Sequence, residues 1–347
     1  MEKVERPRAT DLLTIEELKE AWAHAEPVET GDPVLANVQL ECVGTFYPLG
    51  FPVRIETNEP LVLELAEESW RRFAQRFETR PVHLRVTVTE GETSYCPPTP
   101  VCRMRDHIVS SIADGENYMV TDLAQLRAVV WATQAAVLHR DYFKYFFLES
   151  AAMSSIGSAY ATAIHAGCVA LDDEGVLLCG DSGAGKTTLT YACARAGWTY
   201  VTDDGSYLVH GGDERTVVGN CHQVRFRPSA AELFAELHGR PVMQRAGVGK
   251  PSIELALPVA GAFRASTAAR VRYMVFLRRN VEREELVVFP RAVAQMYLWQ
   301  RMQCMPYEMN RHLNAMRGLQ DVETLELRYN RLDWAVERLA QLVREGS

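Results

Sequence analysis

The sequence predicts an α/β fold preceded by a smaller α+β region. Two observations predict it. Short apolar segments with β-like patterning alternate with segments of helical spacing, and near the middle of the chain a strand, a glycine-rich loop and a helix follow one another directly. The chain has 347 residues, of which 47% are hydrophobic, enough for one large domain or two ordinary ones. The pattern changes near residue 145, so we divide the chain into residues 1–145 and 146–347.

The first region mixes helices and strands. A glycine between two β-like segments predicts one hairpin, and the turn dipeptide Asp114-Gly115 predicts another. The segment that begins at Asp141 is rich in aromatic residues, and its apolar face is typical of a core helix. The expected helices cover residues 14–25, 64–77 and 141–157, and the expected strands cover residues 38–49, 51–57, 81–90, 107–112 and 118–123.

The second region follows an alternating pattern of strands and helices. Its apolar runs are short and lie on both sides of the glycine-rich loop, whereas its last segments have helical spacing. The expected strands cover residues 165–173, 174–180, 199–205, 216–220, 222–228 and 271–279, and the expected helices cover residues 186–196, 299–316 and 332–346.

Composition excludes several classes of function. The net charge of −8 disfavours binding to nucleic acid or to an anionic membrane surface. No window is long and apolar enough for a transmembrane helix, and the N-terminus lacks the apolar core of a signal peptide. The eight cysteines are spread thinly, as expected of reduced thiols. We therefore expect a cytoplasmic protein; a metal or disulfide role for Cys96 and Cys102, which flank PPTPV, stays open.

The glycine-rich loop GDSGAGKT fits the phosphate-loop pattern GxxxxGK[ST] in full. Glycines let successive backbone N–H groups approach phosphate oxygens, and the N-terminus of the following helix attracts the same anion. Lys186 is expected to reach the β- and γ-phosphates, and the Thr187 hydroxyl to hold Mg²⁺. The sequence therefore predicts a nucleoside triphosphate site. Its residues are Gly180, Asp181, Ser182, Gly183, Ala184, Gly185, Lys186, Thr187 and Thr188.

Asp203 and Asp204 come one helix and one strand after this loop. If the two strands lie in a parallel sheet, their ends meet at the edge where ligands bind. One carboxylate could then hold the metal while the other accepts a proton from an incoming hydroxyl. The sequence T-D-D-G is also typical of a turn, so a purely structural role for the two aspartates is the alternative.

This short separation resembles the catalytic domain of the HPr kinase/phosphorylase family, whose loop reads GDSGxGKS and whose next strand ends in V-x-D-D. The family also has an upstream histidine before a strand pair, which His165 matches in HAGCVALDDEGVLLCGDSG. The loop is more distantly similar to that of ATP-dependent phosphoenolpyruvate carboxykinases, which contains GKTT. The resemblance covers roughly residues 160–260. It implies a P-loop kinase domain of this type over residues 146–347, with residues 1–145 as an accessory region for substrate recognition.

The resemblance also implies roles for single residues. Asp204 would accept the proton of a substrate serine and Asp203 would lie on the metal side, although the two aspartates could exchange roles. His165 would lie close to the transferred phosphate, and a hydrogen-bonded core histidine at a strand start is the alternative for this residue. Lys250 in GVGKPSIEL, with Arg225 and Arg227 in QVRFRP, are candidates for contacting phosphate, and ordinary surface ion pairs are the alternative. The family's IRGLGI signature is replaced here by VVGNCHQVRFRP. A second metal-binding carboxylate, phosphorylase activity and recognition of HPr are therefore not implied.

Together these features predict a kinase that uses ATP and Mg²⁺ and phosphorylates a serine-type hydroxyl of a protein or peptide. A small-molecule hydroxyl kinase, and a nucleotide-responsive binding module without transfer, are the alternatives. No nucleic acid or membrane partner is expected, and the sequence leaves formation of a homo-oligomer open.

Overall fold

The computed structural model describes residues 14–23, 38–211, 215–244, 250–257, 263–303 and 307–346. The chain divides into two compact units, Met1–Val38 and Gln39–Ser347. The described part of the first unit is helix α1, Ile15–Ala23, which confirms the predicted helix. Its N-terminus is a capping box: the backbone N–H of Glu17 donates to Thr14 Oγ1 (3.3 Å), and that of Thr14 donates to the Glu17 carboxylate (2.7 Å).

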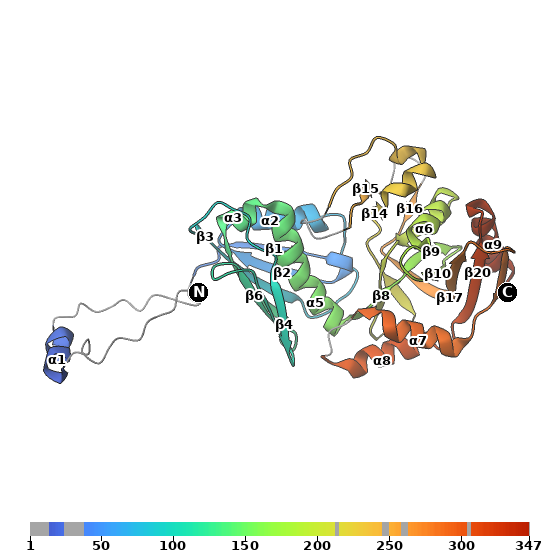
Figure 1. Cartoon of the computed structure of the whole chain (residues 1–347). Coiled ribbons are helices and arrows are strands. Elements are labelled where there is room, and N and C mark those ends of the chain that lie inside the picture. Colours follow the sequence, from blue (N-terminus) through green and yellow to red (C-terminus); the bar gives the residue numbers. More distant parts are fainter. Residues whose placement is uncertain are drawn as a thin grey trace. The chain divides into compact units, whose positions relative to one another are not determined.

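The second unit begins with a mixed sheet in the strand order β1-β2-β3-β7-β6-β5-β4 (Figure 1). Strands β2, β3 and β7 run parallel, and the other neighbours pair antiparallel. Both predicted hairpins are confirmed, by β1 with β2 and by β5 with β6. The strands are β1 Cys42–Phe46, β2 Val53–Thr57, β3 Val82–Thr89, β4 Val101–Arg105, β5 Ile108–Ile112, β6 Tyr118–Asp122 and β7 Arg127–Thr133.

Helices cover one side of this sheet (Figure 1). They are α2 Pro60–Trp70, α3 Gln134–Leu138, α4 Arg140–Phe143, a π-helical segment Lys144–Glu149 and α5 Ser150–Ala159. The helix expected from residue 141 is confirmed. The expectation for residues 64–77 is wrong at both ends, because α2 begins at Pro60, where the Glu59 carboxylate accepts the N–H of Leu61 (3.0 Å), and ends at Trp70. Beyond Trp70 the chain turns away, and the N–H groups of Arg76 and Phe77 donate to the carbonyl of Gly50.

A second sheet has the order β16-β11-β9-β10-β17-β13-β12-β8-β19. The long strand β17 pairs with β13 through its first residues and with β20 through its later residues, and β18 pairs with β20. A separate antiparallel pair is formed by β14 and β15. The strands are β8 Ala161–His165, β9 Gly167–Leu171, β10 Glu174–Cys179, β11 Thr199–Thr202, β12 Gly205–Val209, β13 Thr216–Val218, β14 Gln223–Phe226, β15 Ile253–Ala256, β16 Arg264–Ala265, β17 Ala268–Arg279, β18 Glu285–Val288, β19 Met302–Gln303 and β20 Glu323–Tyr329.

Helices pack on both faces of the second sheet. Helices α6 (Lys186–Arg195) and α9 (Leu332–Glu345) share a core with one face, and α7 (Arg291–Arg301) and α8 (Met309–Arg317) share a core with the other. Both α6 and α9 confirm predicted helices. The single helix predicted over residues 299–316 is wrong, because Met302 and Gln303 leave the helix and pair with Ile164 and Ala163 of β8. This cross-strand pairing overrides the local helical spacing.

The two sheets share one apolar cluster. Residues of the first sheet and of α2 and α5 pack in the same core as Val209, Val218 and Ala268 of the second sheet. The boundary predicted near residue 145 lies in the π-helical segment between α4 and α5, and it stays a prediction. None of the described helices is both long and apolar enough to cross a membrane. Cys96 and Cys102 are exposed, unpaired thiols, so the disulfide alternative is not realised.

A pair of histidines, His312 buried and His210 half-buried, lies where α8 packs on β8 and the end of β12. Thr162 Oγ1 lies 2.8 Å from His210 Nε2 and 2.9 Å from His312 Nδ1. Burial lowers the pKa of His210 to about 4, with the neighbouring His312 and Arg311 acting in the same direction. Burial also lowers the pKa of His312. Both imidazoles are therefore neutral in the folded chain at pH 7.

This pair predicts a loss of stability in mild acid. The unfolded chain binds protons at these histidines below about pH 6.5, whereas folded His210 resists protonation down to about pH 4. The contribution of these histidines to the free energy of unfolding is therefore fully present above about pH 6.5. It falls by about 1–3 kcal/mol as the pH drops from about 6.5 toward 4. Urea unfolding at pH 7 and pH 5 measures the change. His210→Gln should flatten this part of the profile, and an unchanged slope in that variant would contradict the assignment.

Candidate functional site

The glycine loop, residues 180–185, connects β10 to α6. Gly180, Gly183 and Gly185 have φ angles of +150°, +91° and +100°, in the region that favours glycine. A Cβ at Gly180 would lie 2.8 Å from the Cβ of Ala184, and one at Gly185 would lie 2.7 Å from the Tyr329 hydroxyl. The loop therefore needs glycine both for its backbone conformation and for the space around it.

Side chains of α7, and the lysine at the start of α6, hold the loop in place. The N–H of Gly180 donates to the Tyr297 hydroxyl (2.8 Å), which in turn donates to the carbonyl of Gly180 (2.8 Å). One turn along α7, Arg301 forms an ion pair with Asp181. Lys186 is buried and its ammonium donates to the carbonyl of Gly180 (2.7 Å). Burial lowers the pKa of Lys186, while the nearby Asp204 carboxylate opposes this shift.

A cavity of about 580 Å³ lies against this loop and brings together residues from distant parts of the chain. Most of the predicted site residues line it, while Gly180, Asp181 and Ala184 belong to the loop without lining the cavity. The predicted residues in its lining are His165, Ser182, Gly183, Gly185, Lys186, Thr187, Thr188, Asp203, Asp204, Arg225, Arg227 and Lys250.

The cavity has a strongly cationic lining. Its described cationic side chains are Lys186, Arg225, Arg227, Lys250 and Arg279, and its carboxylates are Asp203 and Asp204. Arg225 is also paired with Glu254, whose Oε1 lies 2.9 Å from its Nε, so the ion-pair alternative is realised for this residue. An excess of cations around a cavity of this size is suited to an anion that carries several charges, such as a polyphosphate.

Asp203 is almost fully buried, with 8% of its surface exposed. The Tyr200 hydroxyl donates to its Oδ1 (3.0 Å), and the Thr187 side chain and the backbone N–H of Arg225 also hydrogen-bond to it. Burial, and then the charge of Asp204, raise the pKa of Asp203 to about 6, although these hydrogen bonds act in the opposite direction. Asp203 is therefore held firmly beside Thr187, the residue that the motif assigns to the metal.

Asp204 has a different environment from its neighbour. Its side chain is 62% exposed, and its Oδ1 lies 3.1 Å from Nδ1 of His165. Burial lowers the pKa of His165, and the Asp204 carboxylate counteracts this effect. The contact arises from strand register, because Gly205 at the start of β12 is paired with His165 at the end of β8. The two aspartates occupy a bend between β11 and β12, so their side chains face different surroundings.

The strand arrangement behind these aspartates differs from the expectation. The expectation considered the two strands as members of one parallel sheet, but β9 lies between β10 and β11 and is antiparallel to both. Strands β10 and β11 still point the same way, so the glycine loop and the aspartates lie at the same edge. Strand β9 packs closely against the backbone of Asp203, because a Cβ at Gly167 in β9 would lie 3.0 Å from the carbonyl oxygen of Asp203.

The residues present are compatible with a nucleotide and with Mg²⁺. Among the described residues, no group of three or more His, Cys, Asp and Glu side chains could hold a metal ion by itself. Magnesium is usually bound by one or two protein ligands together with phosphate oxygens and water. Thr187 and Asp203 could serve as these protein ligands. The glycine loop followed by the N-terminus of α6 is an arrangement that binds phosphate groups.

Sequence reasoning missed several residues of this site. Arg279, at the end of β17, lines the cavity, and so does Ser252 next to β15. Tyr297 supports the loop from α7, but the sequence-based helix began two residues later. The VRYMVFLRR strand ends on Arg278 and Arg279, and two arginines at the end of an apolar strand could have indicated an anion-binding residue.

Comparison with known proteins gives little beyond this geometry. No family model matches the chain, and no curated protein matches it. Among solved structures, the HPr(Ser) kinase/phosphatase from Coxiella burnetii matches with 14% sequence identity and a TM-score of 0.26, over 53% of this chain and 99% of that one. A match at this TM-score supports no structural argument, so the case for a function rests on the site itself.

Proposed function

We propose that this chain is a phosphotransferase that uses ATP and Mg²⁺ and phosphorylates a serine-type hydroxyl of a protein or peptide. The observation that carries the proposal is the convergence, in one cationic cavity, of the glycine loop with Lys186 and Thr187 and of Asp203, Asp204 and His165. These groups come from three separate segments of the chain. Their types match the parts that phosphoryl transfer requires: a phosphate cradle, a metal ligand and a base.

The glycine loop side of the cavity would bind the nucleotide. Backbone N–H groups of the loop and of the first turn of α6 would donate to phosphate oxygens, and Lys186 would place its charge beside them. ATP supplies the phosphoryl group, and Mg²⁺ neutralises the oxygens around it. Arg279 and Lys250 line the same cavity and add positive charge where negative charge is transferred.

The aspartate side would position the acceptor. Asp203 is buried and hydrogen-bonded with Thr187, which supports a role next to the metal. Asp204 is exposed and paired with His165, which supports the role of the group that takes the proton from the acceptor hydroxyl. The different surroundings of these adjacent residues favour different roles for them.

Incubation of the full chain with Mg²⁺, γ-labelled ATP and serine-containing peptides tests the proposal. We expect label to appear in peptide and to depend on Mg²⁺. ADP release without labelled peptide, over a broad peptide set and a set of small hydroxyl compounds, would contradict the transferase and favour the nucleotide-responsive binding module. Transfer to the small compounds alone would favour the small-molecule kinase.

A further inference from the structure

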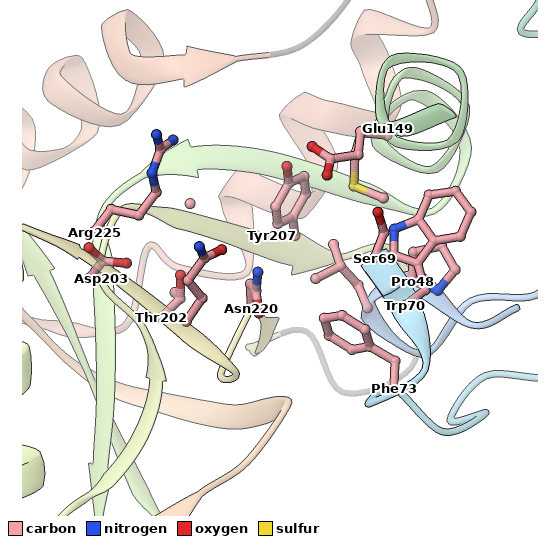
Figure 2. A pocket seen from close by; sticks show the side chains of 14 residues that line it. Pro48, Ser69, Trp70, Phe73, Glu149, Thr202, Asp203, Tyr207, Asn220 and Arg225 are labelled. Atoms are coloured by element: carbon pink, nitrogen blue, oxygen red, sulfur yellow. The ribbon is translucent and has the colours of Figure 1, made fainter. Parts of the chain in front are cut away.

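A second, smaller cavity lies beside the cationic one, and it has a different character. Its volume is about 230 Å³, and its walls come from the first sheet region and from the second sheet (Figure 2). The apolar wall contains Leu49, Trp70, Phe73, Met153 and Tyr207. We call this cavity the anchor pocket.

The anchor pocket borders the candidate phosphate site directly. Asp203 and Arg225 line both cavities. In Figure 2 these two side chains lie together at one end of the pocket, and Trp70 and Phe73 lie at the other. A ligand with a hydroxyl at the shared border could therefore extend an apolar group toward the two aromatic rings.

The pocket wall is built as a fixed structure. Beyond α2, Arg72 Nη1 donates to the carbonyls of Leu257 (2.8 Å) and His222 (3.3 Å), and the Phe73 ring packs edge-on against His222 at 4.8 Å between centroids. These contacts tie the wall that carries Trp70 and Phe73 to the wall that carries Asn220 and Gln223. The pocket is therefore preformed and does not depend on a ligand to bring its walls together.

Leu49 shows backbone strain at the same place. Its φ of 54° and ψ of 14° lie in the left-handed region, which a leucine rarely adopts. The strain persists because its neighbours determine the turn: the N–H of Gly50 donates to the carbonyl of Tyr47, and the carbonyl of Gly50 accepts two N–H groups. Such strain collects at ligand-binding sites, where it holds a side chain in a required place. Here it holds the buried Leu49 side chain in the wall of the pocket.

We propose that the anchor pocket binds one apolar side chain of a peptide acceptor, close in sequence to the serine that is phosphorylated. The inference rests on the proposed function and names its substrate class. The volume is below the roughly 300–1,000 Å³ of typical small-molecule sites, so the pocket accommodates one side chain and not a whole ligand. Aromatic walls suit an aliphatic or aromatic side chain. Asn220 and Gln223 also line the pocket; the Asn220 NH₂ and the Gln223 carbonyl are available for the peptide backbone, since the Asn220 oxygen accepts from His222 and the Gln223 NH₂ donates to Glu254.

A positional peptide set tests the inference on the full chain. Each peptide carries one serine, with every amino acid in turn at each of the three positions on either side. We expect at least one position to prefer leucine, methionine or an aromatic residue over alanine by about tenfold or more in kcat/KM, the range that one apolar pocket provides. Equal rates for apolar and alanine peptides at every position would overturn the inference.

A substitution that fills the pocket locates the effect. Ser69, in the last turn of α2, lines the anchor pocket and is only partly buried, so Ser69→Phe should fill the cavity without disturbing the core. We expect this variant to lose the preference for the apolar peptide while it keeps its KM for ATP and its rate with the alanine peptide. Glu67→Phe is the matched control, because Glu67 is exposed on the same helix and lies outside the pocket lining. A preference that survives in Ser69→Phe would place the peptide elsewhere.

A binding measurement separates this inference from the proposed function. Trp70 lies in the pocket wall, so its fluorescence should change when N-acetyl-leucinamide or the preferred peptide is added, and Ser69→Phe should abolish the change. Binding of neither probe, in a chain that transfers phosphate, would contradict the anchor pocket alone. If the chain binds no nucleotide but still shows the fluorescence change, the proposed function alone would be contradicted.

Discussion

Asp204→Asn is expected to lower the rate of phosphoryl transfer by roughly 10²–10⁴-fold, the usual contribution of a positioned base. Its affinity for ATP should change little, because the side chain is largely exposed and is paired with His165. The amide keeps the shape of the carboxylate but cannot take up a proton. Single-turnover transfer beside nucleotide titration, with and without Mg²⁺, measures both effects.

Asp203→Asn is the matched control, because it makes the same chemical change one residue earlier. Asp203 is buried and hydrogen-bonded with Thr187, so this variant should weaken nucleotide binding in the presence of Mg²⁺ and flatten its dependence on Mg²⁺. If Asp204→Asn loses ATP binding and Asp203→Asn loses only transfer, the roles of the two aspartates must be exchanged. Near-normal transfer in both variants would contradict the catalytic assignment.

Lys186→Ala should reduce transfer by on the order of 10²-fold or more, because phosphoryl transfer depends on positioning and on neutralising charge. The lysine lies at the start of α6, lines the cationic cavity and donates to the carbonyl of Gly180. Its removal takes away a point charge at the place where the β- and γ-phosphates are expected. Steady-state transfer and nucleotide titration measure the loss.

Lys144→Ala is the control for a general effect of losing a lysine, because Lys144 is paired with Glu68 and lines neither of the two cavities. Thermal unfolding of both variants checks that each one folds. A Lys186→Ala protein that is folded and transfers phosphate at nearly the normal rate would show that the glycine loop is not a phosphate site.

Local sequence was enough to predict the elements whose signals lie within a few residues of one another. The turn dipeptide Asp114-Gly115 indicated the hairpin of β5 and β6, and the succession of an apolar strand, the glycine loop and Lys186 indicated β10 and α6. Each of these signals acts through backbone conformation at the residue itself or through side chains one turn apart. Such effects do not depend on the rest of the fold.

Pairing between distant segments was decided only in the tertiary structure. Residues 299–316 were expected to form one helix, yet Met302 and Gln303 join β8, whose edge gains a partner for its N–H and C=O groups. Strand β9 separates β10 from β11 and is antiparallel to both, whereas the expectation considered only a parallel sheet. Strand order depends on hydrogen bonds between residues far apart in the chain, and a local sequence pattern does not predict them.

The candidate site shows the same division. The sequence by itself determined which residues form the glycine loop, because that motif specifies both backbone and side chains over eight consecutive positions. It placed Asp203 and Asp204 near the loop but could not give them different surroundings. Only the tertiary structure buried Asp203 against Thr187 and Tyr200, brought His165 to Asp204 and added Arg279. It also formed the anchor pocket from α2 and from strands more than a hundred residues later, because burial and charge environment are properties of packed neighbours and not of chain order.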